Sequence, residues 1–200
     1  MTLVLWSGGC DSTMVLWNLL QEQSHATPAI RTISINHYAV GGGPEQAQAR
    51  ATILGRLRAK GFRIDHSDVG VSKDGIAVVG GSIIQPLVWL ATATQYLEAT
   101  EDLYAGWVRG DDAWHYKHDI DWLFIHCQRM LFKTGALRYP LEFTHKSDVI
   151  ADLRKNKLLD AVWWCEDPIG GKPCDRCGSC VTHKVALARE RIMKFKAPKT

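Results

Sequence analysis

Residues suited to phosphate binding stand near the start of the chain. Leu3–Trp6 is a short apolar run typical of a β-strand, and a glycine-rich polar segment follows it directly. This segment consists of Ser7, Gly8, Gly9, Cys10, Asp11, Ser12 and Thr13. A glycine loop between a strand and a helix lets backbone N–H groups approach an anion, and the helix N-terminus adds partial positive charge. The hydroxyl groups of the loop would add further donors to phosphate oxygens.

Two common nucleotide-binding motifs do not describe this loop. It lacks the Gly-Lys-Ser/Thr of the Walker loop, and its glycines do not follow the GxGxxG spacing. From the residues alone, the loop could also be a tight strand-to-helix turn with Ser12 as the helix cap. Cys10 lies at the expected helix N-terminus, where a cysteine can be reactive. The simpler interpretation is that its side chain fills space.

Four of the six cysteines crowd into one short stretch near the C-terminus. They are Cys165, Cys174, Cys177 and Cys180. Four thiolates from so short a segment can close a tetrahedron around Zn²⁺, whereas disulfides between such close neighbours would be strained. Because four cysteines leave no coordination position for water, we expect a structural zinc. A redox pair and an iron–sulfur cluster are the alternatives.

The order Ser-Gly-Gly-x-Asp-Ser directly after the first strand resembles the PP-loop of the ATP pyrophosphatase superfamily. Members of that superfamily split ATP between the α and β phosphates. The resemblance implies that Ser7–Thr13 surrounds the released pyrophosphate. It also implies that Asp11 lies near the phosphates or their Mg²⁺, which makes Asp11 a catalytic candidate. Cys10 occupies the variable position of the motif.

The loop and the cysteine cluster together resemble a narrower family, the 7-cyano-7-deazaguanine (QueC) synthases. Those enzymes are cytoplasmic, commonly homodimeric and zinc-binding, and they use ATP and ammonia to convert 7-carboxy-7-deazaguanine into the nitrile precursor of queuosine and archaeosine. Pro140-Leu141 followed by His145-Lys146 and Asp148 is similar to a run of that family. The resemblance implies that Lys146 contacts a phosphate or an acyl-adenylate. A solvated lysine in the first turn of a helix is the alternative.

The middle of the chain departs from the family pattern. After the fourth predicted strand the family carries Gly-Val-Asn and later Asp-Tyr, and here only Gly106 and Asp111 keep register. Trp107 is a candidate to stack on a flat deazapurine, although an aromatic residue after a strand can also belong to the core. Asp111 could accept hydrogen bonds from a guanine-like N–H edge, or it could be a turn residue. His183 stands where the family has an arginine.

Short β-branched runs alternate with longer helical patterns along the chain. The predicted strands are Leu3–Trp6, Arg31–Ile35, Phe62–Asp68, Leu103–Trp107 and Leu137–Phe143. The predicted helices are Ser12–Gln21, Glu45–Lys60, Pro86–Thr100, Asp119–Thr134 and one that begins near His145 with Thr144 as its cap. This alternation predicts an α/β fold with a five-stranded, mostly parallel, doubly wound sheet, similar to the PP-loop and HUP folds. We expect an α/β domain at 1–160 and a small zinc-binding appendage with a C-terminal helix at 161–200.

Composition limits the classes of protein to which the chain can belong. Its 200 residues are 46% hydrophobic and 22% charged with a net charge of +3, which is typical of a globular protein. The mild charge suits ATP but makes a long nucleic acid an unexpected partner. No apolar run is long enough for a membrane span, so we expect a cytoplasmic protein without a membrane partner. Trp163 and Trp164 are expected to pack beneath the zinc cluster.

These observations lead to one main functional hypothesis and three alternatives. The main hypothesis is ATP-dependent, AMP-forming activation of a 7-carboxy-7-deazaguanine-like carboxylate, with Mg²⁺ accompanying ATP, followed by amidation with ammonia and dehydration to the nitrile. A related enzyme could transfer the activated acid to another amine, including in anti-phage defence. A tRNA thiolation enzyme is the second alternative. The third is a nucleotide-binding zinc subunit without catalytic activity.

Overall fold

The computed structural model describes residues 2–24, 28–37, 43–71 and 85–196 of the chain. A single sheet of five strands lies at its centre, in the order β3-β2-β1-β4-β5. The strands are β1 (Thr2–Leu5), β2 (Ile30–His37), β3 (Ile64–Val71), β4 (Asp102–Tyr104) and β5 (Leu137–Arg138). Every neighbouring pair is parallel. The sequence-based prediction of a five-stranded parallel sheet is therefore confirmed.

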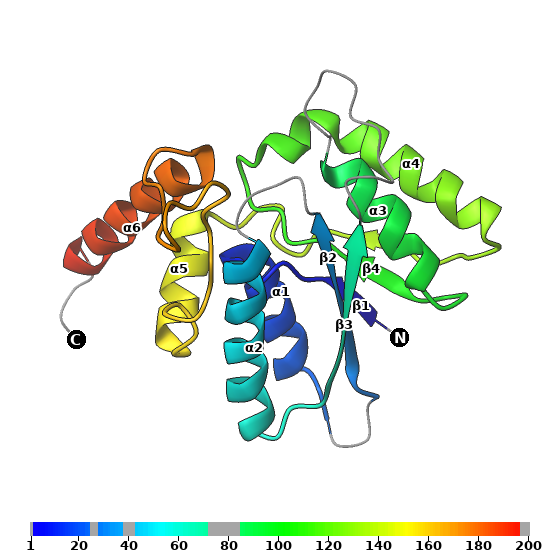
Figure 1. Cartoon of the computed structure of the whole chain (residues 1–200), viewed down its shortest axis with the longest axis horizontal. Coiled ribbons are helices and arrows are strands. Elements are labelled where there is room, and N and C mark those ends of the chain that lie inside the picture. The colour runs from blue at the N-terminus through cyan, green and yellow to red at the C-terminus, as the bar shows by residue number, and fades with distance from the viewer. Residues whose placement is uncertain (1, 25–27, 38–42, 72–84, 197–200) are drawn as a thin grey trace.

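Helices cover both faces of this sheet (Figure 1). They are α1 (Cys10–Gln21), α2 (Gly43–Ala59), α3 (Gln85–Tyr96), α4 (Lys117–Met130), α5 (Lys146–Lys155) and α6 (Gly178–Lys196), and a 3₁₀ turn, η2 (Asp112–Tyr116), precedes α4. Figure 1 shows α1 and α2 on one side of the sheet and α3 and α4 on the other, with α5 and α6 beyond α1. The chain reverses strand order between β1 and β4, and such switch points are where open α/β sheets bind ligands.

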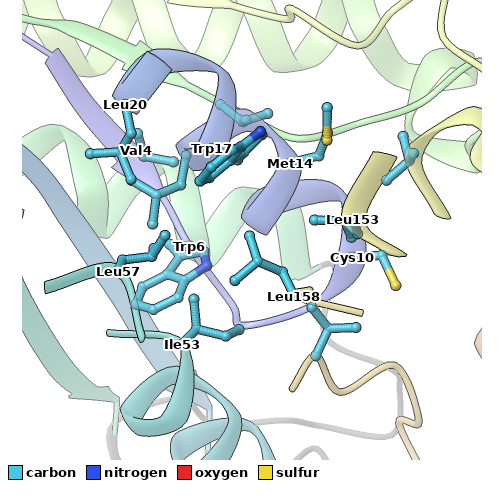
Figure 2. Packing of buried hydrophobic residues seen from close by; sticks show 14 of the residues in the cluster. Val4, Trp6, Cys10, Met14, Trp17, Leu20, Ile53, Leu57, Leu153 and Leu158 are labelled. Atoms are coloured by element: carbon cyan, nitrogen blue, oxygen red, sulfur yellow. The ribbon is translucent and has the colours of Figure 1, made fainter. Parts of the chain in front are cut away.

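Each face of the sheet has its own hydrophobic core. On the α1 and α2 side, the fully buried Trp6 lies in one apolar cluster with Ile53 and Leu57 of α2 and with Leu153 of α5, as Figure 2 shows. On the other side, apolar residues of α3 and α4 pack against β1 and β4. Because α5 contributes to the first cluster, its N-terminus is held close to the beginning of α1.

Several predicted boundaries near the site differ from the structure. The strand predicted at Leu103–Trp107 ends at Tyr104, and the helix predicted from Ser12 begins at Cys10. The strand predicted at Leu137–Phe143 ends at Arg138, since Pro140 has no N–H to donate to a sheet. The helix predicted to begin under a Thr144 cap begins at Lys146 instead. His145 is its N-cap residue and makes no side-chain capping bond. The Thr144 cap is therefore wrong.

The four cysteines lie between α5 and the first turn of α6, in a segment with a single isolated bridge between Ile169 and Lys172. Helices α5 and α6 pack against one another, so this segment is joined to the α/β core. A division of the chain at residues 160 and 161 stays a prediction. Among the described residues, none of the helices combines the length and the apolar character needed to span a bilayer.

Candidate nucleotide site and metal centre

The N-terminus of α1 opens toward the space beyond the carboxyl end of β1. Its N-cap residue is Gly9, which has no side chain to cap the helix. The first bond of the helix runs from the N–H of Thr13 to the carbonyl of Gly9, at 3.1 Å. The N–H groups of Cys10, Asp11 and Ser12 therefore have no partner within the helix. An uncapped helix end of this kind suits an anion.

Serine hydroxyls hold the loop in this open shape. The Ser7 and Ser12 Oγ atoms lie 3.0 Å apart, and Ser12 Oγ also accepts the backbone N–H of Ser7 at 3.2 Å. Ser7 Oγ accepts the N–H of Gly9 at 3.2 Å. Gly8 has φ +85°, and a Cβ there would lie 2.9 Å from Cγ of Arg50. Because glycine alone adopts this conformation without strain, the loop depends on Gly8.

Thr13 has a different role from the one that the sequence predicted. It is fully buried, and its Oγ1 accepts a hydrogen bond from Nε1 of Trp6 at 3.1 Å. This bond ties the first turn of α1 to Trp6, the residue that directly follows β1. A direct contact between Thr13 and a phosphate does not fit this burial. The hydroxyls suited to that contact belong to Ser7 and Ser12.

Asp11 and Lys146, which lie far apart in the sequence, form an ion pair at this helix end. Their side chains are only 19% and 18% exposed, so Lys146 is not the solvated lysine of the alternative interpretation. Burial, the largest single influence, disfavours the ammonium, but the charges of Asp11, Cys10 and Asp111 and the hydrogen bond to Asp11 together outweigh it and raise the pKa of Lys146. Burial also raises the pKa of Asp11, against the attraction of Lys146. Asp11 Oδ1 is buried and has no hydrogen-bond partner within the described part of the chain.

The segment after β4 lies against the first turn of α1 and forms a second wall of the candidate site. Gly106 lies against α1, because a Cβ on it would approach the Ser12 nitrogen to 2.7 Å. Asp111 caps η2, and its Oδ1 accepts the N–H of Ala113 at 2.9 Å. Burial raises the pKa of Asp111, with the charge of Asp11 adding to the shift. Asp111 therefore lies within electrostatic range of Asp11.

Trp107 lies in an aromatic cluster rather than in the open. Its ring stacks on Tyr139 at a centroid distance of 5.3 Å and meets Trp114 edge-on at 6.3 Å. It is 8% exposed. One face of the Trp107 ring is thus covered by Tyr139, and a flat ligand would have to use the remaining surface. The stacking role of Trp107 stays a prediction.

A buried arginine holds the backbone of the phosphate loop, and the sequence analysis assigned this residue no role. Arg50 of α2 is 2% exposed. It donates to the carbonyl of Ser7 at 3.1 Å, to Asn36 Oδ1 at 2.9 Å and to Asp68 Oδ1 at 2.7 Å. Its Nε has no partner among the described residues. The signals in the sequence were an arginine on the apolar side of a predicted helix and a shifted likeness of Gln46 and Arg50 to a Gln-Arg run of the QueC family.

The four cysteines come together as predicted. The Sγ atoms of Cys165, Cys174, Cys177 and Cys180 all lie within 4.8 Å of one another, and those of Cys165 and Cys177 are 4.0 Å apart. Zn–S bonds of about 2.3 Å in a tetrahedron place sulfurs about 3.8 Å apart. In a four-iron cluster each thiolate binds a different iron, which spreads the sulfurs further. The spacing therefore fits a single tetrahedral ion.

Backbone N–H groups around the cluster favour thiolates. Cys174 N–H donates to Cys165 Sγ at 3.2 Å, and Cys177 N–H donates to Cys174 Sγ at 3.3 Å. The N–H groups of Arg176 and Cys177 lower the pKa of Cys174 to about 7. Burial acts in the opposite direction on two other cysteines, because it raises the pKa of Cys165 and raises that of Cys180 to about 12. Metal ligation needs deprotonated cysteines, so a bound cation would have to outweigh this burial.

The two cysteines outside the cluster are both buried. Cys10 is 1% exposed and belongs to the hydrophobic core beside α5. Burial raises the pKa of its thiol to about 12. Burial likewise raises the pKa of Cys127. The burial of the Cys10 side chain favours the simpler of the two sequence interpretations, in which it fills space.

Comparisons with known proteins give one structural similarity to report. No protein-family model and no curated protein matches the chain. Among solved structures, the chain is similar to the U34-tRNA thiolase NcsA from Methanococcus maripaludis with its [4Fe-4S] cluster, with a TM-score of 0.49 and 15% sequence identity. The match covers 97% of this chain and 66% of that one, so the chain spans just under two thirds of the thiolase. At this similarity no property of the thiolase is carried over to the chain.

Proposed function

We propose that the chain is a PP-loop enzyme that cleaves ATP to AMP and pyrophosphate in order to activate a carboxylate. The observation that carries this proposal is the buried Asp11–Lys146 pair at the uncapped N-terminus of α1. A site for a triphosphate needs fixed N–H donors, a cation and a group that can hold Mg²⁺. The helix end, Lys146 and Asp11 meet these three needs.

Asp11 is the residue that would hold Mg²⁺. Its Oδ1 is buried and unpaired among the described residues, and carboxylate oxygens are the ligands that Mg²⁺ takes from proteins. When bound, Mg²⁺ neutralises charge on the phosphates. The N–H groups of the first turn of α1 would bind the β and γ phosphates. Lys146 would then stabilise charge that develops on the α phosphate and on the departing pyrophosphate.

The reaction is an acyl activation. A carboxylate oxygen attacks the α phosphorus, and the bond from that phosphorus to the bridging oxygen breaks with its electron pair going to pyrophosphate. Ammonia attacks the acyl carbon of the resulting acyl-adenylate, AMP leaves, and the nitrogen loses a proton. A second ATP would adenylate the amide oxygen, and loss of AMP and two protons would give the nitrile. The protein contributes positioning and electrostatics rather than a covalent nucleophile.

The proposed substrate is a 7-carboxy-7-deazaguanine-like acid, and the proposed product is 7-cyano-7-deazaguanine. Trp107 and Asp111 would form the wall against which the base lies. Asp111 Oδ1 holds Ala113, which leaves Oδ2 to accept from a guanine-like N–H edge. Because the segment after Gly106 departs from the QueC pattern, transfer of the activated acid to a different amine is the nearest alternative.

Product analysis tests the proposal in two steps. The metal-loaded protein is incubated with Mg·ATP and 7-carboxy-7-deazaguanine, with and without ammonium, and pyrophosphate and AMP are quantified. Mass spectrometry of the base then separates nitrile, amide and conjugate. The expected result is pyrophosphate release that depends on the acid and a product that contains the added nitrogen. Absence of AMP and pyrophosphate with any deazaguanine acid, despite tight ATP binding, would instead support the non-enzymatic subunit.

The two cysteines outside the cluster allow a test of the alternative function, tRNA thiolation. Such chemistry needs a thiol that can carry transferable sulfur, and Cys10 and Cys127 are the two cysteines outside the cluster. Both are buried, and burial raises the pKa of each thiol, which weakens its nucleophilicity. Activity that survives in a Cys10→Ala, Cys127→Ala double variant would exclude this alternative.

The proposal extends to a homodimer in the cytoplasm. Large apolar side chains are exposed on α4 and directly after it: Trp122, Ile125, Met130 and Phe132, at 56%, 52%, 73% and 91%. Exposed large apolar side chains that gather on one element are candidates for a protein contact, so we propose that the dimer contact lies there. Light scattering on the wild type and on an Ile125→Glu variant would show a dimer and a monomer if this placement is correct.

A further inference from the structure

The segment that leads into the cysteine cluster is bonded directly to the phosphate loop. Trp163 donates its backbone N–H to the carbonyl of Gly8 at 3.1 Å. The next residue of the loop is packed against the same segment, since a Cβ on Gly9 would lie 3.4 Å from the Trp163 carbonyl oxygen. Both glycines of the loop therefore rest on the backbone around Trp163.

A second contact reaches the loop from the other side of the cluster. His183 of α6 is 3% exposed, and its Nδ1 lies 3.8 Å from Sγ of Cys10. Its ring stacks on Trp164 at a centroid distance of 3.9 Å with an interplanar angle of 8°. Burial, together with the charges of Lys146 and Arg154, lowers the pKa of His183 to about 4. A neutral imidazole thus packs behind the first residue of α1.

Both contacts stand next to metal ligands in the sequence. Trp163 precedes Cys165 by two residues, and its Nε1 donates to the Cys165 carbonyl at 2.7 Å. His183 follows Cys180 by three residues, within the first turns of α6. A metal that joins Cys165 to Cys180 fixes the distance between these two supports. Without it, the backbone between the two cysteines has little regular structure to keep them together.

We propose that the metal-bound cysteine cluster positions the phosphate loop, with Trp163 and His183 as the positioning residues that connect the two. This inference rests on the proposed ATP site. It gives the metal a role beyond folding the C-terminal segment, because its loss releases both supports of Gly8, Gly9 and Cys10. ATP affinity therefore depends on whether the cluster holds its metal.

The first experiment removes the metal from the wild-type protein. ATP binding is measured by calorimetry before and after treatment with a chelator, and hydrogen exchange is followed in residues 7–13 and, as an internal reference, in α4. We expect ATP affinity to fall by about tenfold or more, the effect of losing about one net hydrogen bond. Exchange should rise in the loop and stay unchanged in α4. Unchanged ATP affinity in a folded, metal-free protein overturns the inference.

Paired variants test the same connection with the metal in place, in case the metal-free protein unfolds. Trp163→Pro and Trp163→Ala both lose the indole, but only proline also removes the N–H that Gly8 accepts. His183→Ala loses both the Cys10 contact and the stacking on Trp164, whereas His183→Phe keeps a flat ring against Trp164. With one metal per chain retained, we expect weaker ATP binding for the proline variant than for the alanine variant, and weaker binding for His183→Ala than for wild type.

Two negative results have different meanings. Equal ATP affinity in Trp163→Pro, Trp163→Ala and wild type, all metal-loaded, overturns the positioning role. No ATP binding by the wild-type, metal-loaded protein overturns the proposed ATP site itself. Loss of activity with unchanged ATP affinity also contradicts the inference, because a displaced phosphate loop must weaken binding.

Discussion

The two walls of the candidate site differ in how their polar groups are paired. On the phosphate side, the first N–H groups of α1 have no partner within the helix, and Asp11 Oδ1 is buried without a partner among the described residues. On the aromatic side, Trp114 Nε1 donates to the Val108 carbonyl at 2.7 Å and Tyr139 donates to Asp121 at 2.6 Å. Asp111 is engaged with Ala113.

This difference shows where a ligand gains most from binding. A buried polar group without a partner is unfavourable, and a ligand that supplies the partner removes that penalty. If a triphosphate with Mg²⁺ binds as proposed, its oxygens would accept the N–H groups of α1 and the cation would pair with Asp11 Oδ1, so the phosphate side would contribute free energy to binding. The aromatic side is already satisfied by its own contacts, so it gives shape and at most one further hydrogen bond. Phosphate contacts should dominate affinity, and the aromatic side should affect the choice of acid.

The strongest test of this comparison is Asp11→Ala. Removal of the carboxylate should lower ATP-dependent pyrophosphate release by about 10²–10³-fold, the scale for losing one group that stabilises charge in a transition state. It also leaves the Lys146 ammonium, 18% exposed, without its partner. Asp11→Asn, which keeps the shape and an acceptor, separates a catalytic defect from unfolding when circular dichroism is measured alongside. Wild-type rates in both variants would remove Asp11 from the site.

The variant Gly106→Ala tests how closely the segment after β4 packs against the first turn of α1. A Cβ there would lie 2.7 Å from the Ser12 nitrogen and 2.8 Å from the Asp11 carbonyl carbon, so the loop has to move. We expect ATP affinity to fall about tenfold, because N–H groups displaced by a few tenths of an ångström bond poorly. The matched control is Gly55→Ala in α2, where a Cβ meets nothing within 4 Å. That variant should bind ATP normally and gain about 0.5–1 kcal/mol of stability.

The sequence predicted the phosphate side better than the aromatic side, for a physical reason. A strand, two glycines and a helix start are local features, and the pattern Ser7–Thr13 contains them all. The four-cysteine cluster is local in the same sense. Arg50 could not be assigned, because its partners Ser7, Asn36 and Asp68 come from three separate segments.

The sequence left open whether Trp107 stacks on a ligand or belongs to the core, and for a related reason it could not show which residue covers its ring. Tyr139, which stacks on it, follows β5, and its place beside Trp107 depends on the pairing of β4 with β5. Thr13 shows the limit of a motif, because its hydroxyl is used by Trp6, one position before the loop. A sequence motif identifies the residues of a site, but the packing around them determines which of their atoms can still contact a ligand.

A smaller effect is expected for Asp111→Asn. Asparagine caps a helix turn as well as aspartate does, so the stability of η2 should change little. If Asp111 accepts from the N–H edge of the base, KM for the acid should rise about five- to tenfold while ATP affinity stays constant, the cost of about one net hydrogen bond. Steady-state kinetics with each substrate varied in turn measures both. An unchanged KM for the acid would leave Asp111 with its capping role alone.

The least effect on catalysis is expected for Thr13→Val, although Thr13 belongs to the loop. Valine has the shape of threonine but cannot accept the Trp6 Nε1 hydrogen bond, and both residues are fully buried. An indole N–H left unpaired in the core should lower the free energy of unfolding by about 1–3 kcal/mol. Urea denaturation measures this, with Thr52→Val of α2 as a control whose hydroxyl bonds only within its own helix. If ATP contacts Ser7 and Ser12 rather than Thr13, as proposed, pyrophosphate release by the folded variant should stay within about twofold of wild type, since the lost bond lies outside the reacting groups. A large fall in release without loss of stability would restore Thr13 to the phosphate-binding hydroxyls and would show that the loop changes shape when ATP binds.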